Sequence, residues 1–334
     1  MRFVVGVDGG GTKTTAVVVS EDVRVVGGAT SGPANSRSVG AEAAAANIAS
    51  AVSAALVIAG VRLDEVAALC LCLAGLDTDL DLPVPRAAVQ ALGYTGPAIF
   101  ENDVVGAWAG ATEVGAGLVV IAGTGSTALG MNARGEFWRT DGWDYVLGDS
   151  GSAYDIGRSA IRAAMRALDG RAAPTLLTRE MGRHYSVADA EGMRRLVDST
   201  EFGKVEMSGF AARVSEAANA GDVTARDILA GAGSDLAQQA IAIIRALGMA
   251  GTEFPVATVG SVFKATPWVT EPFTRLISQA APRAVVRDPV HPPEVGAAIL
   301  ALHRLPEADF GSWSLGMGSR IIHRTLPIDL GASS

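Results

Sequence analysis

The chain has 334 residues, of which 49% are hydrophobic and 19% are charged, and its formal net charge is −8. This composition excludes a disordered chain, and the length predicts two lobes rather than one compact domain. The sequence lacks the Lys/Arg clusters that nucleic-acid binders use, so we expect no nucleic-acid partner.

The two cysteines, Cys70 and Cys72, lie in an apolar run that reads as a buried strand. Neighbours on one strand face seldom form a disulfide, and a chain without a disulfide framework is typical of a reducing compartment. No charged and apolar leader precedes the first predicted strand, and no apolar run approaches the ~18 residues of a membrane span. We therefore expect a cytoplasmic protein with no membrane partner.

Strand-like and helix-like patterns alternate along the first third of the chain, which predicts an α/β fold. A glycine after an Ala-rich helical pattern marks the helix end. In chain order the pattern predicts strands over 4–7 and 14–20, a helix over 39–59 that ends at Gly60, strands over 68–73 and 98–100, and a helix over 104–111.

A second strand–turn–strand pattern begins near residue 118 and predicts the start of a second lobe. This weak internal repeat puts the domain boundary near residues 111–116. Further on, the pattern predicts strands over 118–122 and 127–131, a helix over 222–248 with a break at Gly231 and Gly233, strands over 256–259 and 285–286, and a helix over 294–302. The tail from Asp309 carries apolar residues that predict packing against a lobe: Trp313, Ile321, Ile322 and Leu326.

The Gly-rich turn between the first two predicted strands is the sharpest chemical signal. Glycines let a backbone approach phosphate oxygens, and Thr12 and Lys13 add further donors. Asp8 ends the first strand, where it could hold Mg²⁺ through water. An ordinary hairpin would give the same pattern. Because a strand follows, the turn is neither a Walker A nor a dinucleotide-binding loop.

A second Gly/Thr turn, GTGS at residues 123–126, has the same chemistry and opens the second lobe. Two such turns, one in each lobe, predict two lobes that close on one triphosphate. The predicted phosphate-binding residues are Gly10, Gly11, Thr12, Lys13, Gly123, Thr124, Gly125 and Ser126.

Asp103 lies between a predicted strand end and a helix start. It could be a helix N-cap, as could Asn102, or a general base that takes the proton of an attacking hydroxyl. In the loop over 141–157, Trp143 and Asp149 are candidates for sugar binding, although Ser150 or Ser152 capping a helix would explain the same composition. Gly260 follows a strand and could lie against a nucleotide base or simply make a turn.

These features, in this order, resemble the actin-like ATPase superfamily of hexokinases, actin and heat-shock chaperones. The segments VGVDGGGTKT, IAGTGS and GWDYVLGDSGSAYDIGR are similar to those of N-acetylglucosamine kinases grouped with BadF-type ATPases, and the match covers residues 4–303. The resemblance implies two ribonuclease H-like lobes with ATP and sugar in a central cleft. One lobe would span 1–112 with 293–334, and the other 113–292.

The resemblance also implies the site. Asp103 would be the catalytic base, Mg²⁺ would accompany ATP, and Gly260 and Ser261 would lie by the adenosine. The implied sugar contacts are Asn35, Thr127, Gly142, Trp143, Asp149 and Ala153. The implied activity is phosphorylation of the primary hydroxyl of N-acetylglucosamine or glucosamine, and we expect a homodimer.

Two positions depart from the mammalian pattern of this family. Thr127 replaces an asparagine that touches the sugar, and Ala74 replaces a serine. Because each change shortens or removes a polar group, the sequence leaves the identity of the amino sugar open.

Three other functions remain as alternatives. An ATP-driven activator of a CoA-ester reductase or dehydratase would need cysteines for a shared iron–sulfur cluster. A nucleotide-gated chaperone or filament subunit would bind ATP without phosphorylating a sugar. A zinc-containing glucokinase would need a Cys-rich motif that this sequence lacks.

Overall fold

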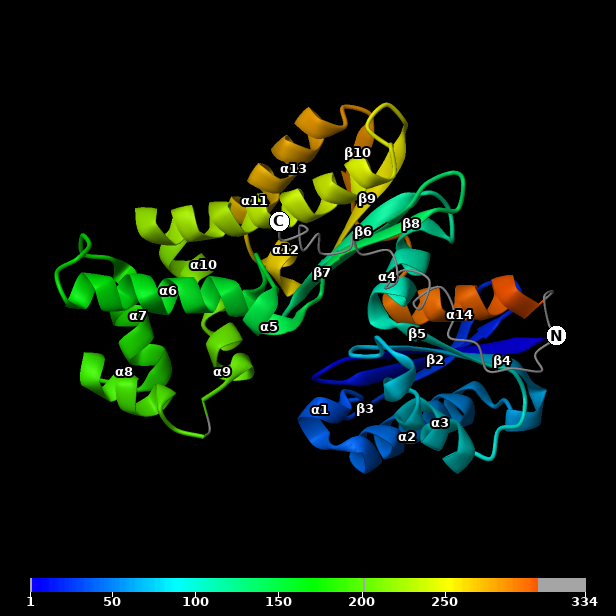
Figure 1. Cartoon of the computed structure of the whole chain (residues 1–334). Coiled ribbons are helices and arrows are strands. Elements are labelled where there is room, and N and C mark those ends of the chain that lie inside the picture. The colour runs from blue at the N-terminus through cyan, green and yellow to red at the C-terminus, as the bar shows by residue number, and fades with distance from the viewer. Residues whose placement is uncertain (1, 201, 306–334) are drawn as a thin grey trace, which may run out of the picture. The chain divides into compact units, whose positions relative to one another are not determined.

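The structure, a computed structural model, describes residues 2–200 and 202–305, and the tail from Asp309 lies outside them. It divides into two compact units. The first comprises the chain up to Gly115 together with the chain from Pro289, and the second comprises Ala116–Asp288. Each unit contains one five-stranded sheet covered by helices (Figure 1). This is the α/β architecture that the sequence predicts.

The sheet of the first unit combines an antiparallel hairpin with two parallel strands. The order is β3 (Val25–Ser31), β2 (Thr14–Ser20), β1 (Phe3–Gly9), β4 (Val66–Leu73) and β5 (Ala98–Asn102). β1–β2 and β2–β3 are antiparallel, whereas β1–β4 and β4–β5 are parallel. Four of these strands are predicted from the sequence. The edge strand β3, whose centre is Gly27-Gly28, is not.

Helices cover both faces of this sheet. α2 (Ala41–Ala59) and α3 (Pro83–Ala91) cover one face, and α4 (Asp103–Thr112) and α14 (Pro293–Arg304) cover the other (Figure 1). Short helices connect them: α1 (Ser36–Val39), η1 (Leu63–Glu65) and η2 (Asp79–Asp81). α2 ends at Gly60 as predicted, but it begins two residues later, because Gly40 separates it from α1.

Helix α2 corrects one expectation from the sequence. It is long and apolar enough to cross a membrane by length and composition, with a mean hydropathy of 1.6. Its apolar face is buried within the first unit, through residues such as Ile48, Val52 and Leu56. Packing against the sheet accounts for this composition. The sequence analysis missed this helix because its ten alanines, with Glu42, Asn47 and two serines among them, do not form a continuous run of large apolar residues.

The sheet of the second unit repeats the topology of the first. Its order is β10 (Ala284–Arg287), β9 (Phe254–Val259), β6 (Gly117–Ala122), β7 (Ser126–Met131) and β8 (Phe137–Asp141). β6–β7 and β7–β8 are antiparallel, and β6–β9 and β9–β10 are parallel. The weak repeat in the sequence is therefore a repeat of whole sheets.

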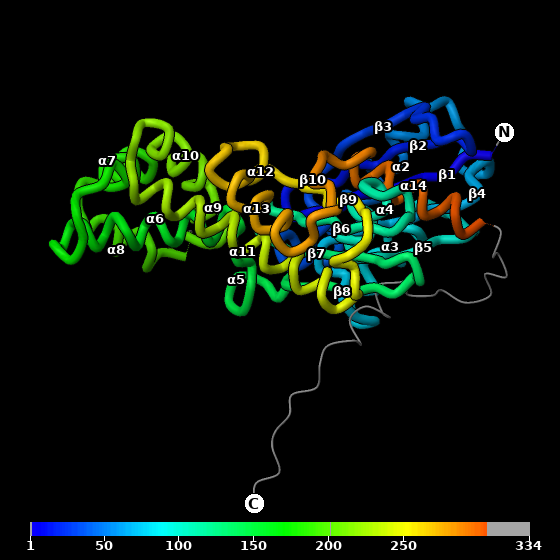
Figure 2. Tube along the Cα trace, turned by 90° about the horizontal axis from the view of Figure 1, so that it is seen from above, coloured from blue at the N-terminus to red at the C-terminus, as the bar shows by residue number. Residues whose placement is uncertain are grey.

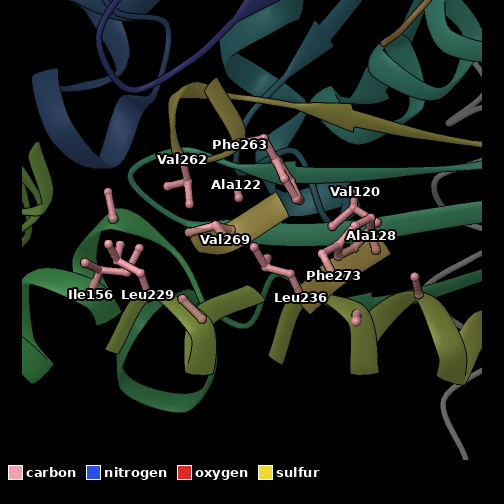
Figure 3. Packing of buried hydrophobic residues seen from close by; sticks show 14 of the residues in the cluster. Val120, Ala122, Ala128, Ile156, Leu229, Leu236, Val262, Phe263, Val269 and Phe273 are labelled. Atoms are coloured by element: carbon pink, nitrogen blue, oxygen red, sulfur yellow. The ribbon is translucent and has the colours of Figure 1, made fainter. Parts of the chain in front are cut away.

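The second unit has a helical cluster beside its sheet (Figure 1). Its helices are α5 (Asp144–Leu147), α6 (Ala153–Leu168), α7 (Leu176–Tyr185), α8 (Ala190–Val197), α9 (Lys204–Gly209), α10 (Ala211–Asn219), α11 (Val223–Ala246), α12 (Ser261–Ala265) and α13 (Pro267–Ala280). Figure 3 shows the core in which α11 and α13 pack against the sheet, with Leu236, Val269 and Phe273 among its buried side chains.

The predicted break in the helix over 222–248 is wrong, because α11 runs without interruption from Val223 to Ala246. α11 and α13 lie side by side (Figures 1 and 2). A Cβ at Gly233 would lie 2.2 Å from the carbonyl oxygen of Val269 in α13. Gly233 thus serves helix packing rather than helix termination.

The two glycines of α11 give a matched test of this packing. Gly233→Ala should destabilise the protein by about 1–3 kcal/mol, because the new methyl group overlaps the backbone of α13. Gly231→Ala should instead stabilise it by about 0.5–1 kcal/mol, since a Cβ there meets no atom within 4 Å. Urea unfolding of both variants measures these changes. Equal effects of the two substitutions would contradict the packing role of Gly233.

Candidate active site

The carboxyl ends of three neighbouring parallel strands form the candidate site of the first unit. Asp8 in β1 pairs with Cys72 in β4, which pairs with Glu101 in β5. Asp103 follows β5 as the first residue of α4. Ligands of open α/β sheets bind at such edges. The fold therefore brings Asp8 and Asp103 to one edge of one sheet.

The turn over residues 10–13 joins β1 to β2 at this same edge. The Gly10 N–H donates to the Lys13 carbonyl oxygen at 2.9 Å, and the Ala34 N–H donates to the Gly10 carbonyl oxygen at 3.1 Å. A Cβ at Gly11 would meet no atom within 4 Å, and Gly11 does not have positive φ. Neither packing nor backbone conformation requires glycine at this position. Glycine at this position would, however, let a ligand approach the backbone closely.

Asp8 is a strongly perturbed carboxyl group at this edge. Its pKa is raised from 3.8 to about 7, first by burial and then by the Asp103 and Glu294 carboxylates, whereas Lys13 lowers it. Perturbed carboxyl groups of this kind cluster at functional sites. A bound cation would relieve the repulsion.

The structure decides between the two candidates for the cap of α4. Asn102 is the N-cap, and its Oδ1 accepts a hydrogen bond from the Val104 N–H at 3.1 Å. The Asn102 Nδ2 also donates to Asp77 at 3.0 Å. The Val104 N–H also donates to Asp103 Oδ1, at 2.9 Å, so Asp103 lies at the start of the helix without being its N-cap. Asn35 is a cap as well, since its Oδ1 accepts from the Arg37 N–H that opens α1.

In the second unit, the turn over 123–126 is held by the start of α6. The Ala153 N–H donates to the Gly123 carbonyl oxygen at 2.8 Å, and the Tyr154 N–H donates to that of Thr124 at 3.4 Å. Gly123, like Gly11, has open space at its Cβ position and no positive φ. Both predicted phosphate turns thus contain a glycine that the fold itself does not need.

Asp149 connects the predicted sugar loop to this turn. Its Oδ1 accepts a hydrogen bond from the Ser126 N–H at 2.9 Å, and the residue is 3% exposed. A Cβ at Gly125 would lie 2.6 Å from the same oxygen, so glycine is needed there. Ser152 caps α6 independently by accepting from the Asp155 N–H. Helix capping therefore does not account for Asp149.

Asp141 and Gln239 organise this loop, and the sequence analysis missed both. Asp141 accepts hydrogen bonds from the N–H groups of Gly142, Asp149 and Ser150. Gln239 Nε2 donates to Asp141 Oδ2 at 2.9 Å and to Ser126 Oγ at 3.1 Å. Asp141 lies in the loop itself, whereas Gln239 comes from α11 and carries no local signal.

The loop has an unusual backbone. Asp141, Asp144 and Asp149 all have φ near +60°, in the left-handed region that non-glycine residues seldom adopt. Each such residue costs about 1–2 kcal/mol, so the side-chain hydrogen bonds hold the loop against its own preference.

The other predicted sugar contacts lie along the same loop. The Gly142 N–H donates to the Ser126 carbonyl oxygen, and Trp143 is 55% exposed. The hydroxyl of Thr127 donates to the Thr140 carbonyl oxygen and accepts from Arg139 Nε, both at 3.3 Å. Ala153 is the first residue of α6.

Gly260 lies beside the second turn. Its φ is 109°, and a Cβ there would lie 2.2 Å from the Ala122 carbonyl oxygen, directly before Gly123. Ser261 begins α12. The fold alone explains this glycine, but it brings Gly260 next to the predicted phosphate turn.

The donors of the first unit fit Mg²⁺ held through water. Among residues 2–200 and 202–305, no group of three or more His, Cys, Asp and Glu side chains could hold a metal ion directly. The neighbouring carboxyl groups of Asp8 and Asp103 still offer oxygen acceptors to a hydrated ion. Mg²⁺ keeps several of its waters and takes phosphate oxygens as ligands, so this pair suits it.

A family model described as the BadF/BadG/BcrA/BcrD ATPase family matches residues 5–301. The chain belongs to this family. ATP is the nucleotide that the family description names. The two five-stranded sheets of this member have the arrangement that the resemblance to the actin-like ATPase fold implies.

Known members and solved structures resemble this family member along most of its length. It is 30% identical to an N-acetylmuramic acid/N-acetylglucosamine kinase of Clostridium acetobutylicum over 90% of this chain and 98% of the relative. It is 29% identical to an N-acetyl-D-glucosamine kinase of Dictyostelium discoideum over 90% of this chain and 98% of that relative. A candidate N-acetylglucosamine kinase of Chromobacterium violaceum has a similar structure, with a TM-score of 0.74, 27% identity, and coverage of 90% of this chain and 99% of that one.

Proposed function

We propose that this ATPase-family member is an amino-sugar kinase that transfers the γ-phosphate of ATP to the primary hydroxyl of N-acetylglucosamine or glucosamine. The observation that carries the proposal is the carboxyl edge of the first sheet, where Asp8, Asp103 and the Gly10–Lys13 turn meet. A carboxylate beside a phosphate-binding turn can orient a hydroxyl for transfer. The names of the two curated relatives supply the class of sugar.

Asp103 is the proposed general base. Its carboxylate would accept the proton of the sugar hydroxyl as that oxygen attacks the γ-phosphorus, and the bond to the β,γ-bridging oxygen breaks. Backbone N–H groups of the two Gly-rich turns would hold the phosphates. Asp8 would hold Mg²⁺ through water, and the bound ion would neutralise charge on the phosphate oxygens.

Asp149, Trp143 and Asn35 are the proposed centre of sugar binding. A carboxylate that is already fixed by the Ser126 N–H can accept hydrogen bonds from ring hydroxyls without reorganising. The exposed Trp143 ring offers an apolar wall for the sugar. The remaining proposed contacts are Thr127, Gly142 and Ala153, and Gly260 with Ser261 would face the adenosine.

The primary hydroxyl is proposed for a geometric reason. It projects from the sugar ring, so it can reach both Asp103 and the γ-phosphate in line.

The proposal also includes the assembly and the lobes of the protein. The protein would be a homodimer in the cytoplasm. One lobe would span 1–112 with 293–334, and the other would span 113–292.

The alternative of a CoA-ester reductase or dehydratase activator is disfavoured by the cysteines. Cys70 and Cys72 are both fully buried, with their Sγ atoms 3.9 Å apart. Burial also raises the pKa of the Cys72 thiol, after the larger effect of its hydrogen bond with Cys70. Thiols held in this way are poorly placed to ligate a cluster shared between two subunits.

We expect ADP release from Mg-ATP to rise at least about tenfold when an amino sugar is added, because the sugar completes the site that water fills poorly. A coupled assay with glucosamine, N-acetylglucosamine, N-acetylmuramic acid, N-acetylmannosamine and glucose measures this. ATP hydrolysis that no sugar stimulates would favour the nucleotide-gated alternative, and a preference for glucose would contradict the amino-sugar assignment.

A further inference from the structure

The proposed sugar-binding carboxylate, Asp149, has an unusual pair of partners. Its Oδ1 accepts from the Ser126 N–H, while its Oδ2 lies 2.7 Å from Lys204 Nζ in α9. Oδ2 is buried, and at 2.7 Å its contact with the Lys204 ammonium is a charge-assisted ion pair. A carboxylate oxygen has two lone pairs, so Oδ2 can still accept a hydrogen bond beside this ion pair.

Lys204 joins both ends of the short helix α5. Its ammonium donates to Asp144 Oδ1 at 2.7 Å, at the start of α5, and contacts Asp149 two residues beyond its end. Nζ also lies 5.6 Å from the ring centre of Tyr145. The lysine side chain is 28% exposed and that of Asp149 is 4% exposed, so water screens this pair far less than a surface pair.

The helix that carries Lys204 is firmly seated. α9 packs so closely on α6 that a Cβ at Gly157 would lie 2.0 Å from the Met207 carbonyl oxygen. α6 in turn donates to the phosphate turn through its first N–H groups. Lys204 thus contacts the sugar loop from a helix that packs on α6, and α6 also supports the phosphate turn.

The backbone of the sugar loop needs side-chain contacts such as those of Lys204 to hold its conformation. Asp144 and Asp149 both have positive φ, a conformation that must be held by contacts outside the backbone. Removing the lysine would leave the carboxylate of Asp149 buried without its counter-ion, which is unfavourable. The carboxylate would then turn toward water or lose its alignment with the Ser126 N–H.

We propose that Lys204 is a positioning residue for sugar binding, which orients the Asp149 carboxylate so that Oδ2 can accept a hydrogen bond from a sugar hydroxyl. The inference rests on the proposed function, because Asp149 is a sugar ligand in that proposal. The residues beside Asp149 in sequence do not reveal it, since Lys204 follows 55 positions later in a separate helix.

The test compares steady-state kinetics of Lys204→Met, Lys204→Arg and the wild type, with N-acetylglucosamine and Mg-ATP as substrates. We expect Lys204→Met to raise the sugar KM by about tenfold or more, and to change the KM for ATP by less than about twofold. Lys204→Arg keeps the charge and should restore the sugar KM to within about threefold of the wild type. Asp144→Asn, which removes one anchor of the lysine, should have an intermediate effect.

Arg171→Met is the matched control. Arg171 forms an equally short ion pair with Asp169 at 2.6 Å, but both side chains are exposed, and we expect no change in either KM. An unchanged sugar KM in Lys204→Met would overturn the inference. So would equal rises in both KM values with a lower Tm, because that pattern describes general destabilisation.

Two further outcomes are distinct. If Lys204→Met does not fold, Lys204→Gln replaces it, because glutamine keeps a donor for Asp144. Lys204→Gln should show the same selective rise in sugar KM. Failure of both variants to fold would overturn the inference in favour of a structural role. If the wild type phosphorylates none of the five sugars, the proposed function fails first. A wild type that turns over the sugar, beside an unaffected Lys204→Met, refutes the positioning role alone.

Discussion

Asp103→Asn is expected to fold like the wild type and to lose kcat by at least ~10²-fold, the lower range for a general base. Asparagine has the same size but cannot take a proton from the sugar hydroxyl. The helix should be little affected, because its N-cap is Asn102 and because an asparagine side chain at position 103 keeps an oxygen that can accept from the Val104 N–H. Steady-state kinetics and a thermal melt of the same preparation measure both properties.

Asn102→Ala is the reciprocal control for this variant. Loss of the cap should lower the free energy of unfolding by about 1 kcal/mol, while kcat per folded molecule falls far less than in Asp103→Asn. If Asp103→Asn instead melts early and keeps its activity per folded molecule, Asp103 is structural and the assignment of the base is wrong.

Asp8→Asn is expected to make the ligand-free protein more stable and nearly inactive. The pKa of Asp8 is raised to about 7, so the fold favours the neutral acid. Stability from the neutral form is fully present below the ordinary pKa of 3.8 and is lost as the pH rises through about 7. Asparagine stays neutral, so the variant should exceed the wild type by about 4 kcal/mol near pH 8 and match it near pH 4.

Urea unfolding at several pH values, with and without Mg-ATP, measures this difference. Mg-ATP should stabilise the wild type more than Asp8→Asn, because the variant lacks the carboxylate that would hold the ion. Asp235→Asn is the control: its pKa is also raised, by burial and by Asp155, but it lies outside the site and should keep full activity. A lower stability of Asp8→Asn at high pH would contradict the origin of the raised pKa.

The sequence predicts the two Gly-rich turns and their flanking strands, because these signals are local. Runs of β-branched and apolar residues on both sides of Gly11 and Gly123 favour strands that meet at a tight turn. Because one such strand–turn–strand pattern opens each lobe, the same signals also predict two lobes in this chain order. The edge strands β3 and β8 escape prediction, since β3 contains Gly27-Gly28 and β8 is five partly buried residues without alternation.

The residues that support the site are harder to predict, because their signal is spatial. Gln239 lies in a regular helix, and nothing around it in sequence indicates a bond to Asp141. In the sequence Lys204 resembles any surface lysine, and only the packing of α9 on α6 places it beside Asp149. Gly233 reads as a helix breaker, although it allows the approach of a second helix. Side chains that touch the ligand are thus more visible in sequence than those that hold them.

The most direct test of the amino-sugar kinase proposal is ³¹P and ¹³C NMR of the product formed from Mg-ATP and N-acetylglucosamine or glucosamine. The proposal predicts a phosphomonoester on the primary carbon of at least one of these sugars, formed by the wild type and lost in Asp103→Asn. Phosphate on the anomeric carbon, or release of inorganic phosphate with both sugars unmodified, would contradict it.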